Sequence, residues 1–404
     1  MKKIFFLTLI FNFAKPFDAI IIGGGGYDRG IGGIGLNYLS CFDQDIDNLN
    51  IGYITLEEFE KNINLAKIKI AQKDAQAKVK FFTYLLAIKD GEQIIDFTDK
   101  IISNSSINCA VSMLESDSIP SFWVDILNNK FDLVIVPDQW LIEIYQNCGV
   151  NIPIFVLDLV VDYNGLKKHK QKNKNFTFGM VSGLLEDKNI DKVIQAFNTI
   201  FKNAKNINLK IKISGNKKFN PILWDNIHKL ANQAQNISLI TKHLDRTEYC
   251  EFLNSLDCYI LPSRGEGFSI TTREALYREI PCIISKHTAL KCFCDCHAAI
   301  GLNPSNLTRA NYTCFGNFDS YKIDVKTRDI AKEMKNVVHN YEKLKAKTVL
   351  AKNICENAKK NNIYPKLKNL FSGNIVLADK NTISDTCVTT DSVQLYTKFK
   401  DKNE

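Results

Sequence analysis

Short apolar runs alternate with helix-like stretches along most of this chain, and this alternation constrains the fold more than any other feature of the sequence. In the first part of the chain, apolar runs at 19–22, 51–55, 109–113, 133–136 and 154–157 predict strands, and residues 139–148 have a helical pattern. Strands that alternate with helices favour a parallel sheet covered by helices on both faces. We therefore expect an α/β domain in this part of the chain.

A polar, lysine-rich segment at 164–175 interrupts the pattern, and a second series of strands and helices then begins. Strands are predicted at 176–181, 209–214, 237–241, 258–261, 282–285 and 299–302, and helices at 189–201, 221–235, 246–255 and 270–277. A chain of 404 residues is long for one domain and suits two. We therefore predict an α/β protein with two doubly wound domains facing across a cleft, then helices at 328–341 and 344–357, and an irregular polar tail from 374.

Composition and charge narrow the class of protein. Hydrophobic residues make up 45% of the chain and charged residues 24%, as in ordinary globular proteins. The net charge is +8, but no basic stripe is interleaved with aromatic residues, so we expect no binding of nucleic acid. The 12 cysteines are irregularly spaced, and a chain of this length needs no disulfides. These features favour a reducing, cytoplasmic setting.

The first 14 residues leave three alternatives open. Two lysines precede an apolar stretch that resembles the hydrophobic region of a signal peptide. However, no small-residue cleavage site follows clearly, and the stretch is too short to span a bilayer. A strand or surface segment, a membrane contact and a cleaved signal are the alternatives.

The most informative local motif is a pair of glutamates, Glu266 and Glu274, around a predicted loop and helix start. Glu266 lies between Gly265 and Gly267, directly after a buried strand. In open α/β sheets, such loops lie at the carboxyl ends of the strands, where ligands bind. Glycines allow a ligand to approach the backbone closely, and a helix start offers free N–H groups to a phosphate. The pair is therefore expected to bind two parts of one nucleotide-sugar; the alternative is an ordinary acid at a helix start.

The sequence Ser263-Arg-Gly-Glu-Gly-Phe-Ser, followed by Glu274-Ala-Leu and Ile280-Pro-Cys-Ile-Ile-Ser, resembles the signature of family 4 glycosyltransferases, the group 1 enzymes with the GT-B fold. One departure is that Glu279-Ile280 replaces the glycine before Pro281. The resemblance implies that Glu266 acts at the donor sugar and that Glu274 binds the ribose. It also implies that the donor diphosphate faces a short backbone segment, formed by Gly267, Phe268 and Ser269.

Lys188 matches a second element of this family, a lysine that reaches the donor diphosphate from a loop after a strand. A compact ammonium suits a leaving group whose negative charge grows as the glycosidic bond breaks. Many members also have an arginine five residues earlier, where this chain has Gly183. The resemblance therefore leaves one donor cation missing or supplied by Arg264. An ordinary surface lysine is the alternative for Lys188.

The resemblance also concerns the first domain and the domain boundaries. The segment 29–33 is similar to the family's N-terminal glycine loop, so Gly32 and Gly33 are expected at the cleft. Glu115 is expected at the cleft as an acceptor-side or sugar-contacting carboxylate. The alternatives are an ordinary strand–helix turn for the glycines and a solvated loop acid for Glu115. The implied organisation is an acceptor domain at 1–165, a donor domain at 166–350, a helix at 351–373 that returns to the first domain, and a polar tail at 374–404.

Together these likenesses imply a retaining glycosyltransferase that moves a hexosyl-type sugar from a nucleotide-diphospho-sugar to a glycan or lipid-linked hydroxyl in bacterial surface-polysaccharide assembly. No cofactor and no metal are expected; the cysteines and histidine at 292–297 are too crowded for the usual zinc spacing. The expected place is the cytoplasm, with a peripheral contact at the inner face of the membrane as an option. A catalytically silent GT-B scaffold and an epimerase-like enzyme are the alternatives. The base, the sugar, the acceptor, the linkage and the oligomeric state are left open.

Overall fold

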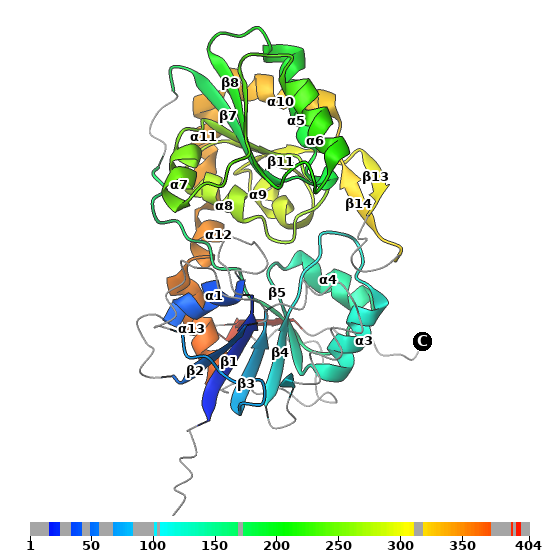
Figure 1. The fold of residues 1–404 in the computed structure, drawn as a ribbon, viewed down its shortest axis with the longest axis vertical. Coiled ribbons are helices and arrows are strands. Elements are labelled where there is room, and N and C mark those ends of the chain that lie inside the picture. Colours follow the sequence, from blue (N-terminus) through cyan, green and yellow to red (C-terminus); the bar gives the residue numbers. More distant parts are fainter. Residues whose placement is uncertain are drawn as a thin grey trace, which may run out of the picture.

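Two parallel β-sheets, each covered by helices, form the two domains of the protein (Figure 1). The computed structural model describes residues 16–24, 34–42, 49–55, 68–83, 101–102, 106–168, 173–310, 318–372, 389–390 and 393–396. The predicted α/β class with two doubly wound domains is confirmed. Within these described ranges, no helix is both long enough and apolar enough to cross a membrane.

The first sheet has its parallel strands in the order β2, β1, β3, β4, β5, β6. These are Ile51–Thr55, Phe17–Gly23, Ala77–Phe82, Ile107–Val111, Leu133–Val136 and Ile154–Val156. Strand β1 lies between β2 and β3, where Ala19 aligns with Ile51 and Val79. The helices α1, α3 and α4 cover Ile34–Leu39, Ser121–Lys130 and Trp140–Asn147.

Strand β3 was not predicted, because two lysines interrupt its apolar pattern. Lys78 is exposed and pairs with Asp18, whereas Lys80 is buried and donates a hydrogen bond to the carbonyl of Ile101. A lysine can place its apolar stem in a core when its ammonium finds an acceptor. The strand therefore lies inside the sheet despite its mixed sequence.

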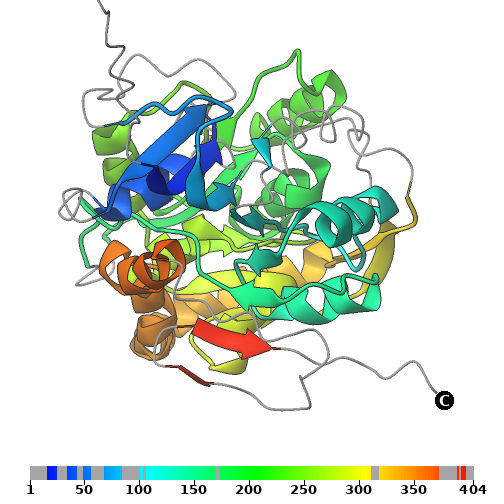
Figure 2. The ribbon, with the colours of Figure 1, turned by 90° about the horizontal axis from the view of Figure 1, so that it is seen from below.

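Part of the tail that was expected to be irregular forms strands. Within the described residues, β15 (Thr389–Thr390) and β16 (Val393–Tyr396) form an antiparallel pair. Strand β16 also pairs antiparallel with β6, aligning Leu395 with Phe155, and Figure 2 shows it in red at the edge of the first sheet. The tail thus covers an edge that β6 would otherwise expose.

The second sheet has the order β12, β11, β10, β7, β8, β9, with all its strands parallel. In chain order these are Phe176–Gly183, Ile207–Ser214, Ile237–Ile240, Cys258–Leu261, Cys282–Ser285 and Ile300–Leu302. The helices α5 to α9 are Ile190–Phe201, Pro221–Ala231, Arg246–Asn254, Ile270–Tyr277 and Lys291–Asp295. Side-chain caps fix two helix starts: Asn220 precedes α6, and Asp245 forms a capping box with Glu248 before α7.

A two-stranded hairpin after β12 was not predicted and reaches the first domain. It consists of β13 (Asn306–Arg309) and β14 (Tyr321–Asp324), drawn in yellow at the right of the second domain in Figure 1. The backbone N–H of Tyr321 donates to Asp117 at 2.7 Å, and the Ser118 hydroxyl donates to the carbonyl of Asp319 at 2.9 Å. The hairpin is thus a contact between the domains, opposite the linker.

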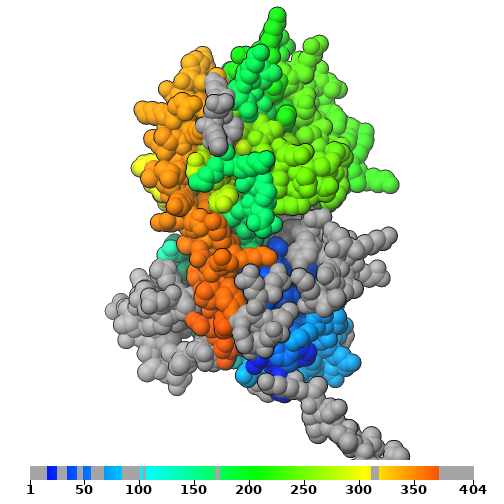
Figure 3. Space-filling model, turned by 90° about the vertical axis from the view of Figure 1, so that its left-hand side faces the viewer, coloured from blue at the N-terminus to red at the C-terminus, as the bar shows by residue number. Residues whose placement is uncertain are grey.

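Four helices, α10 to α13, end the well-packed part of the chain and lead back to the first domain. They cover Thr327–His339, Tyr341–Lys347, Lys352–Asn357 and Lys360–Phe371, and Figure 3 shows them in orange along one face. The helix expected at 344–357 is interrupted at Thr348, whose hydroxyl donates to the carbonyl of Lys345 and begins a 3-10 turn. In the first domain, Phe371 stacks on Phe42 with ring centroids 5.4 Å apart.

The chain crosses between the domains twice at the same place. The linker after β6 makes the first crossing, and α12 makes the second. The backbone N–H of Val161 donates to the carbonyl of Ala358 at 2.8 Å, and the Tyr163 hydroxyl donates to the carbonyl of Cys355 at 3.0 Å. The Tyr163 ring also stacks on Tyr277 of α8, with centroids 4.1 Å apart.

The backbone at Glu279, just beyond the end of α8, explains why the resembled signature has a glycine before the proline. Glu279 has a left-handed backbone with φ of 62°, the conformation in which helices commonly end on glycine. Its side chain pairs with the exposed Lys168. A residue with a Cβ is strained in this conformation.

Replacing Glu279 with glycine is therefore expected to raise the free energy of unfolding by about 1 kcal/mol, because relief of this strain exceeds the loss of an exposed ion pair. Urea unfolding followed by circular dichroism measures the change. Glu279→Ala is the matched control, since it removes the same ion pair but keeps a Cβ. Equal stabilities for the two variants would contradict the explanation.

Candidate functional site

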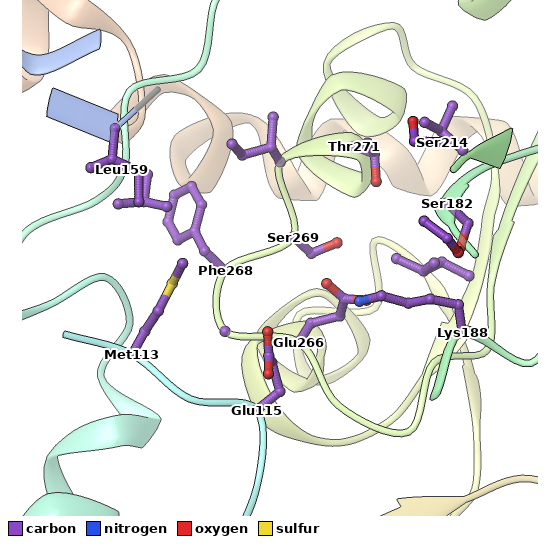
Figure 4. A pocket seen from close by; sticks show the side chains of 16 residues that line it. Met113, Glu115, Leu159, Ser182, Lys188, Ser214, Glu266, Phe268, Ser269 and Thr271 are labelled. Atoms are coloured by element: carbon purple, nitrogen blue, oxygen red, sulfur yellow. The ribbon is translucent and has the colours of Figure 1, made fainter. Parts of the chain in front are cut away.

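A cavity of about 280 Å³ lies between the two domains. Figure 4 shows side chains from both domains around it, with Phe268 close to Met113 and Leu159 at one end, Lys188 at the other end, and Glu266 and Glu115 between them. Its lining residues are Ile34, Met113, Glu115, Leu159, Val181, Ser182, Gly183, Lys188, Ser214, Leu261, Glu266, Gly267, Phe268, Ser269, Ile270 and Thr271.

The strand order of the second sheet explains why Lys188 and Glu266 meet. Strands β7 and β10 are neighbours, while the chain continues from β7 to β8 on one side and from β10 to β11 on the other. The loops after β7 and β10 therefore separate and leave a crevice at their carboxyl ends, which is where open α/β sheets bind ligands. Lys188 follows β7 and Glu266 follows β10.

Lys188 and Glu266 form a partly buried ion pair at the floor of the cavity. The Lys188 Nζ lies 2.6 Å from Glu266 Oε1, and the two side chains are 17% and 12% exposed. Burial by itself lowers the pKa of Lys188, but the negative charges of Glu266 and Glu115 outweigh it, so the pKa is raised. The ammonium is therefore fully charged near neutral pH.

The loop after β7 is held against the loop after β10. Asn189 has a left-handed backbone (φ 53°), and its side-chain amide donates to the carbonyl of Pro262 at 2.8 Å and to Asp324 at 2.9 Å. The backbone N–H of Arg264 donates to the carbonyl of Asp187 at 2.7 Å. These bonds fix the position of the Lys188 side chain relative to Glu266.

The glycines that flank Glu266 allow the first domain to approach closely. A Cβ atom on Gly265 would lie 2.0 Å from the backbone oxygen of Glu115, and one on Gly267 would lie 2.9 Å from the sulfur of Met113. The expected role of these glycines was close approach of a ligand. The structure shows a second reason for them: the loop after β4 lies so close that side chains at positions 265 and 267 would clash with it.

The start of α8 faces the cavity. Ser269 precedes the helix in a left-handed conformation (φ 60°), and its hydroxyl lies 2.8 Å from that of Thr272. Ser269, Ile270 and Thr271 line the cavity. The first N–H groups of a helix have no partners within it and attract anions. This end of the cavity therefore suits a phosphate group.

Glu274 is buried beside the cavity and is not among its lining residues. The Tyr249 hydroxyl donates to Glu274 Oε2 at 2.6 Å, and Arg246 Nη1 lies 3.3 Å from Oε1. Burial raises the pKa of Glu274 to about 6, although Tyr249 and Arg246 both favour the charged form. Sequence reasoning missed Arg246 and Tyr249, which have no motif of their own.

This raised pKa predicts a dependence of stability on pH. Because the folded pKa of Glu274 exceeds its usual value of 4.5, the stability from this group is fully present below about 4.5 and is lost as the pH rises through about 6. The loss is about 2 kcal/mol, since one pKa unit corresponds to about 1.36 kcal/mol. Glu274→Gln removes the titration, so its unfolding free energy should rise relative to wild type by that amount between pH 4.5 and 7.5.

Urea unfolding of both proteins across this range measures the difference. The exposed Glu251→Gln on α7 is the matched control and should follow the wild type. A difference between Glu274→Gln and wild type that stays constant with pH would exclude this role of Glu274.

The other residues predicted for the site divide into three groups. Gly183 and Glu115 line the cavity. Arg264 is not among the lining residues, because its guanidinium turns to Asp324, with Nε 3.3 Å from Oδ2. Gly32 and Gly33 lie outside the described residues. Sequence reasoning also missed Met113, Leu159 and Thr271, which are ordinary residues with no signal except their places after strands or at a helix start.

The cysteines at 292–296 are packing residues. Cys294 belongs to the hydrophobic core, Cys292 and Cys296 pack against it, and burial raises the pKa of both Cys292 and Cys294 to about 12. Across the described part of the chain, no cluster of three or more histidine, cysteine, aspartate or glutamate side chains is arranged to hold a metal ion.

Comparisons with known proteins agree with this geometry. The model of a family described as "Glycosyl transferases group 1" matches residues 164–292. Over 122 residues the chain is 30% identical to the capsular polysaccharide biosynthesis glycosyltransferase CapM of Staphylococcus aureus, which is 30% of this chain and 31% of CapM. The chain thus matches about a third of the length of this curated relative.

Solved structures resemble most of the chain. HepE of Anabaena in complex with UDP and glucose has a TM-score of 0.65 at 11% identity, covering 88% of this chain and 99% of HepE. The trehalose-6-phosphate synthase OtsA has a TM-score of 0.60 at 9% identity, covering 89% and 99%. A variant of TarM of Staphylococcus aureus, in complex with UDP among other ligands, has a TM-score of 0.54 at 16% identity, covering 72% and 55%. At these identities the likeness concerns the fold. The chain therefore has the GT-B fold, and the stretch at 164–292 is similar to the group 1 glycosyltransferases.

Proposed function

We propose that the protein transfers a sugar from a nucleotide-diphospho-sugar to a hydroxyl group presented by the first domain. The observation that carries the proposal is the Lys188–Glu266 pair in the cavity between the domains, next to the start of α8. Lys188 and the N–H groups at the start of α8 would hold the diphosphate and stabilise it as a leaving group. Glu266 would act at the donor sugar, and Glu274 would bind the ribose.

Several finer features belong to the same proposal. The solved complexes of HepE and TarM contain UDP, which supports a uridine diphosphate donor. CapM takes part in capsular polysaccharide biosynthesis, which supports a glycan or lipid-linked acceptor of a bacterial surface polysaccharide. Retention of configuration, a hexosyl donor and independence from metal rest on the resemblance to the family 4 enzymes. The cytoplasm and a peripheral membrane contact are proposed on the same basis.

The test begins with calorimetric titration of the full chain with UDP- and GDP-linked sugars. Donors that bind are then incubated with glycan and lipid-linked acceptors, with and without a metal chelator. Release of nucleoside diphosphate that depends on an acceptor, together with a labelled product, is the expected result. Release without any acceptor would favour an epimerase-like or hydrolytic enzyme.

One observation favours a second candidate, a catalytically silent GT-B scaffold. Gly183 lines the cavity where many relatives have an arginine, and the guanidinium of Arg264 is paired with Asp324. A scaffold of this kind would bind none of the nucleotide-sugars in the titration. The same experiment therefore separates the two functions.

A further inference from the structure

Arg273 of α8 is a buried charge that contacts the donor-side loop, residues 265–269. The residue is 1% exposed and is not among the residues that line the cavity. The centre of its guanidinium lies 3.5 Å from the ring centroid of Phe268 and 5.1 Å from that of Phe293. Its Nη1 also donates a hydrogen bond to the carbonyl of Phe268. Arg273 thus holds both the ring and the backbone of one loop residue.

The counter-charge of Arg273 comes from the other domain. Arg273 Nη2 lies 3.5 Å from Oδ2 of Asp138, which follows β5 of the first domain. The backbone N–H of Trp140, at the start of α4, donates to the other carboxylate oxygen of Asp138 at 3.3 Å. The Asp138 side chain is 16% exposed. One guanidinium therefore connects the donor-side loop to a fixed position in the first domain.

A buried ion pair contributes little net stability, because desolvation of the charges offsets their attraction. Removing one partner is costly, however, because the other charge is left buried and alone. The arginine fork also makes directional bonds, so it fixes orientation as well as distance. Such a pair is suited to setting the geometry of two elements relative to each other.

We infer that Arg273 and Asp138 are a positioning pair that makes the shape of the donor-side loop depend on the docking of the two domains. Two glycine contacts also make the shape of this loop depend on the first domain, since Gly265 lies against Glu115 and Gly267 against Met113. When the domains separate, Asp138 leaves Arg273, so the guanidinium that donates to the Phe268 carbonyl is no longer held from the first domain. The inference rests on the proposed function only in that this loop is the donor site.

Hydrogen–deuterium exchange of the full chain, without any ligand, tests the pair. Asp138→Asn removes the charge and keeps the size, and we expect amide exchange in peptides covering 265–276 to become at least about threefold faster, since a held segment then opens more often. The matched control is Asp225→Asn, which breaks the exposed pair of Lys217 and Asp225 and should leave these peptides unchanged. Equal exchange in the two variants, or faster exchange spread over both domains, would overturn the inference.

Conservative variants separate positioning from general stability. Asp138→Glu restores a carboxylate and should recover most of the protection at 265–276. Arg273→Lys keeps a charge without the fork, so its protection at 265–276 should stay nearly as low as that of Asp138→Asn. This variant remains informative if Asp138→Asn fails to fold. Recovery that is equal in both variants would also count against the pair.

Donor binding gives the link to function. Asp138→Asn should weaken the binding of a UDP-sugar by about tenfold, and Asp138→Glu should restore it. If the wild type binds no nucleotide-sugar while the exchange results hold, the proposed function fails and the coupling between the domains stands. If the wild type binds donor and neither exchange nor binding changes in Asp138→Asn, the positioning role fails alone.

Discussion

Replacing Lys188 with methionine is expected to lower kcat/KM for sugar transfer by at least about 10²-fold, with the protein still folded. The substitution removes the ammonium that would stabilise the leaving diphosphate, and loss of one such group costs about 10² to 10³ in rate. It also leaves Glu266 in a partly buried position without its partner at 2.6 Å. Donor titration and initial rates with a labelled nucleotide-sugar measure the two effects separately.

The chain offers a closely matched control in Lys192. Its Nζ lies 2.6 Å from Asp324, and the two side chains are 22% and 11% exposed, so the pair resembles Lys188 and Glu266 in distance and burial. Lys192 is not among the residues that line the cavity. Lys192→Met also removes a lysine from a partly buried pair, but transfer should fall only a few-fold, and Asp324 keeps its contacts with Arg264 and Asn189. Similar losses of transfer in the two variants would mean that Lys188 acts through folding rather than on the donor.

Gly265→Ala is expected to have the second large effect, on both stability and transfer. The new Cβ would lie 2.0 Å from the backbone oxygen of Glu115 and 3.1 Å from its carbonyl carbon. Backbone atoms cannot turn aside as a flexible side chain can, so either the loop or the first domain must shift. Overpacking typically costs about 1–3 kcal/mol. A shift of about 1 Å at a reacting group can cost about 10²-fold in rate.

Thermal unfolding and transfer rates test this prediction. Gly183→Ala is the control for stability, because its Cβ would find its nearest neighbour, in Leu185, at 3.7 Å, an ordinary contact distance. Its melting temperature should stay close to that of the wild type, whereas that of Gly265→Ala falls by several degrees. Unchanged stability and rate in Gly265→Ala would show that the loop after β4 does not press on this glycine in solution.

The strands that could be predicted are those whose apolar runs are continuous. Strands β2, β5, β10 and β11 match their predicted ranges, because strands of a parallel sheet are largely buried and their sequences are mostly apolar. Strand β3 was missed because Lys78 and Lys80 interrupt its apolar run, and the burial of Lys80 depends on a hydrogen bond to the distant Ile101. The β13–β14 hairpin was missed because its two strands are short and mix polar with apolar residues, so neither carries a continuous apolar run.

The site was only partly accessible from the sequence. Lys188 and Glu266 could be proposed for the same donor through the family resemblance. Their ion pair, however, follows from the strand order, which places β7 beside β10 and which no local sequence pattern indicates. Arg273 directly precedes Glu274, yet nothing in the sequence indicates that it pairs with Asp138. Contacts between domains join residues that are far apart in the chain, so periodicity and spacing cannot indicate them.

The two adjacent chain crossings have a mechanical consequence. They join the domains along one side, where Val161 bonds to Ala358 and Tyr163 to Cys355. On the opposite side, the β13–β14 hairpin meets Asp117 and Ser118 through a few hydrogen bonds. Two covalent connections side by side prevent the domains from sliding apart and leave rotation about a single axis as the least costly relative motion. We therefore expect the domains to open by rotation about the two crossings, with the hydrogen bonds of the hairpin breaking first and the cavity widening between them.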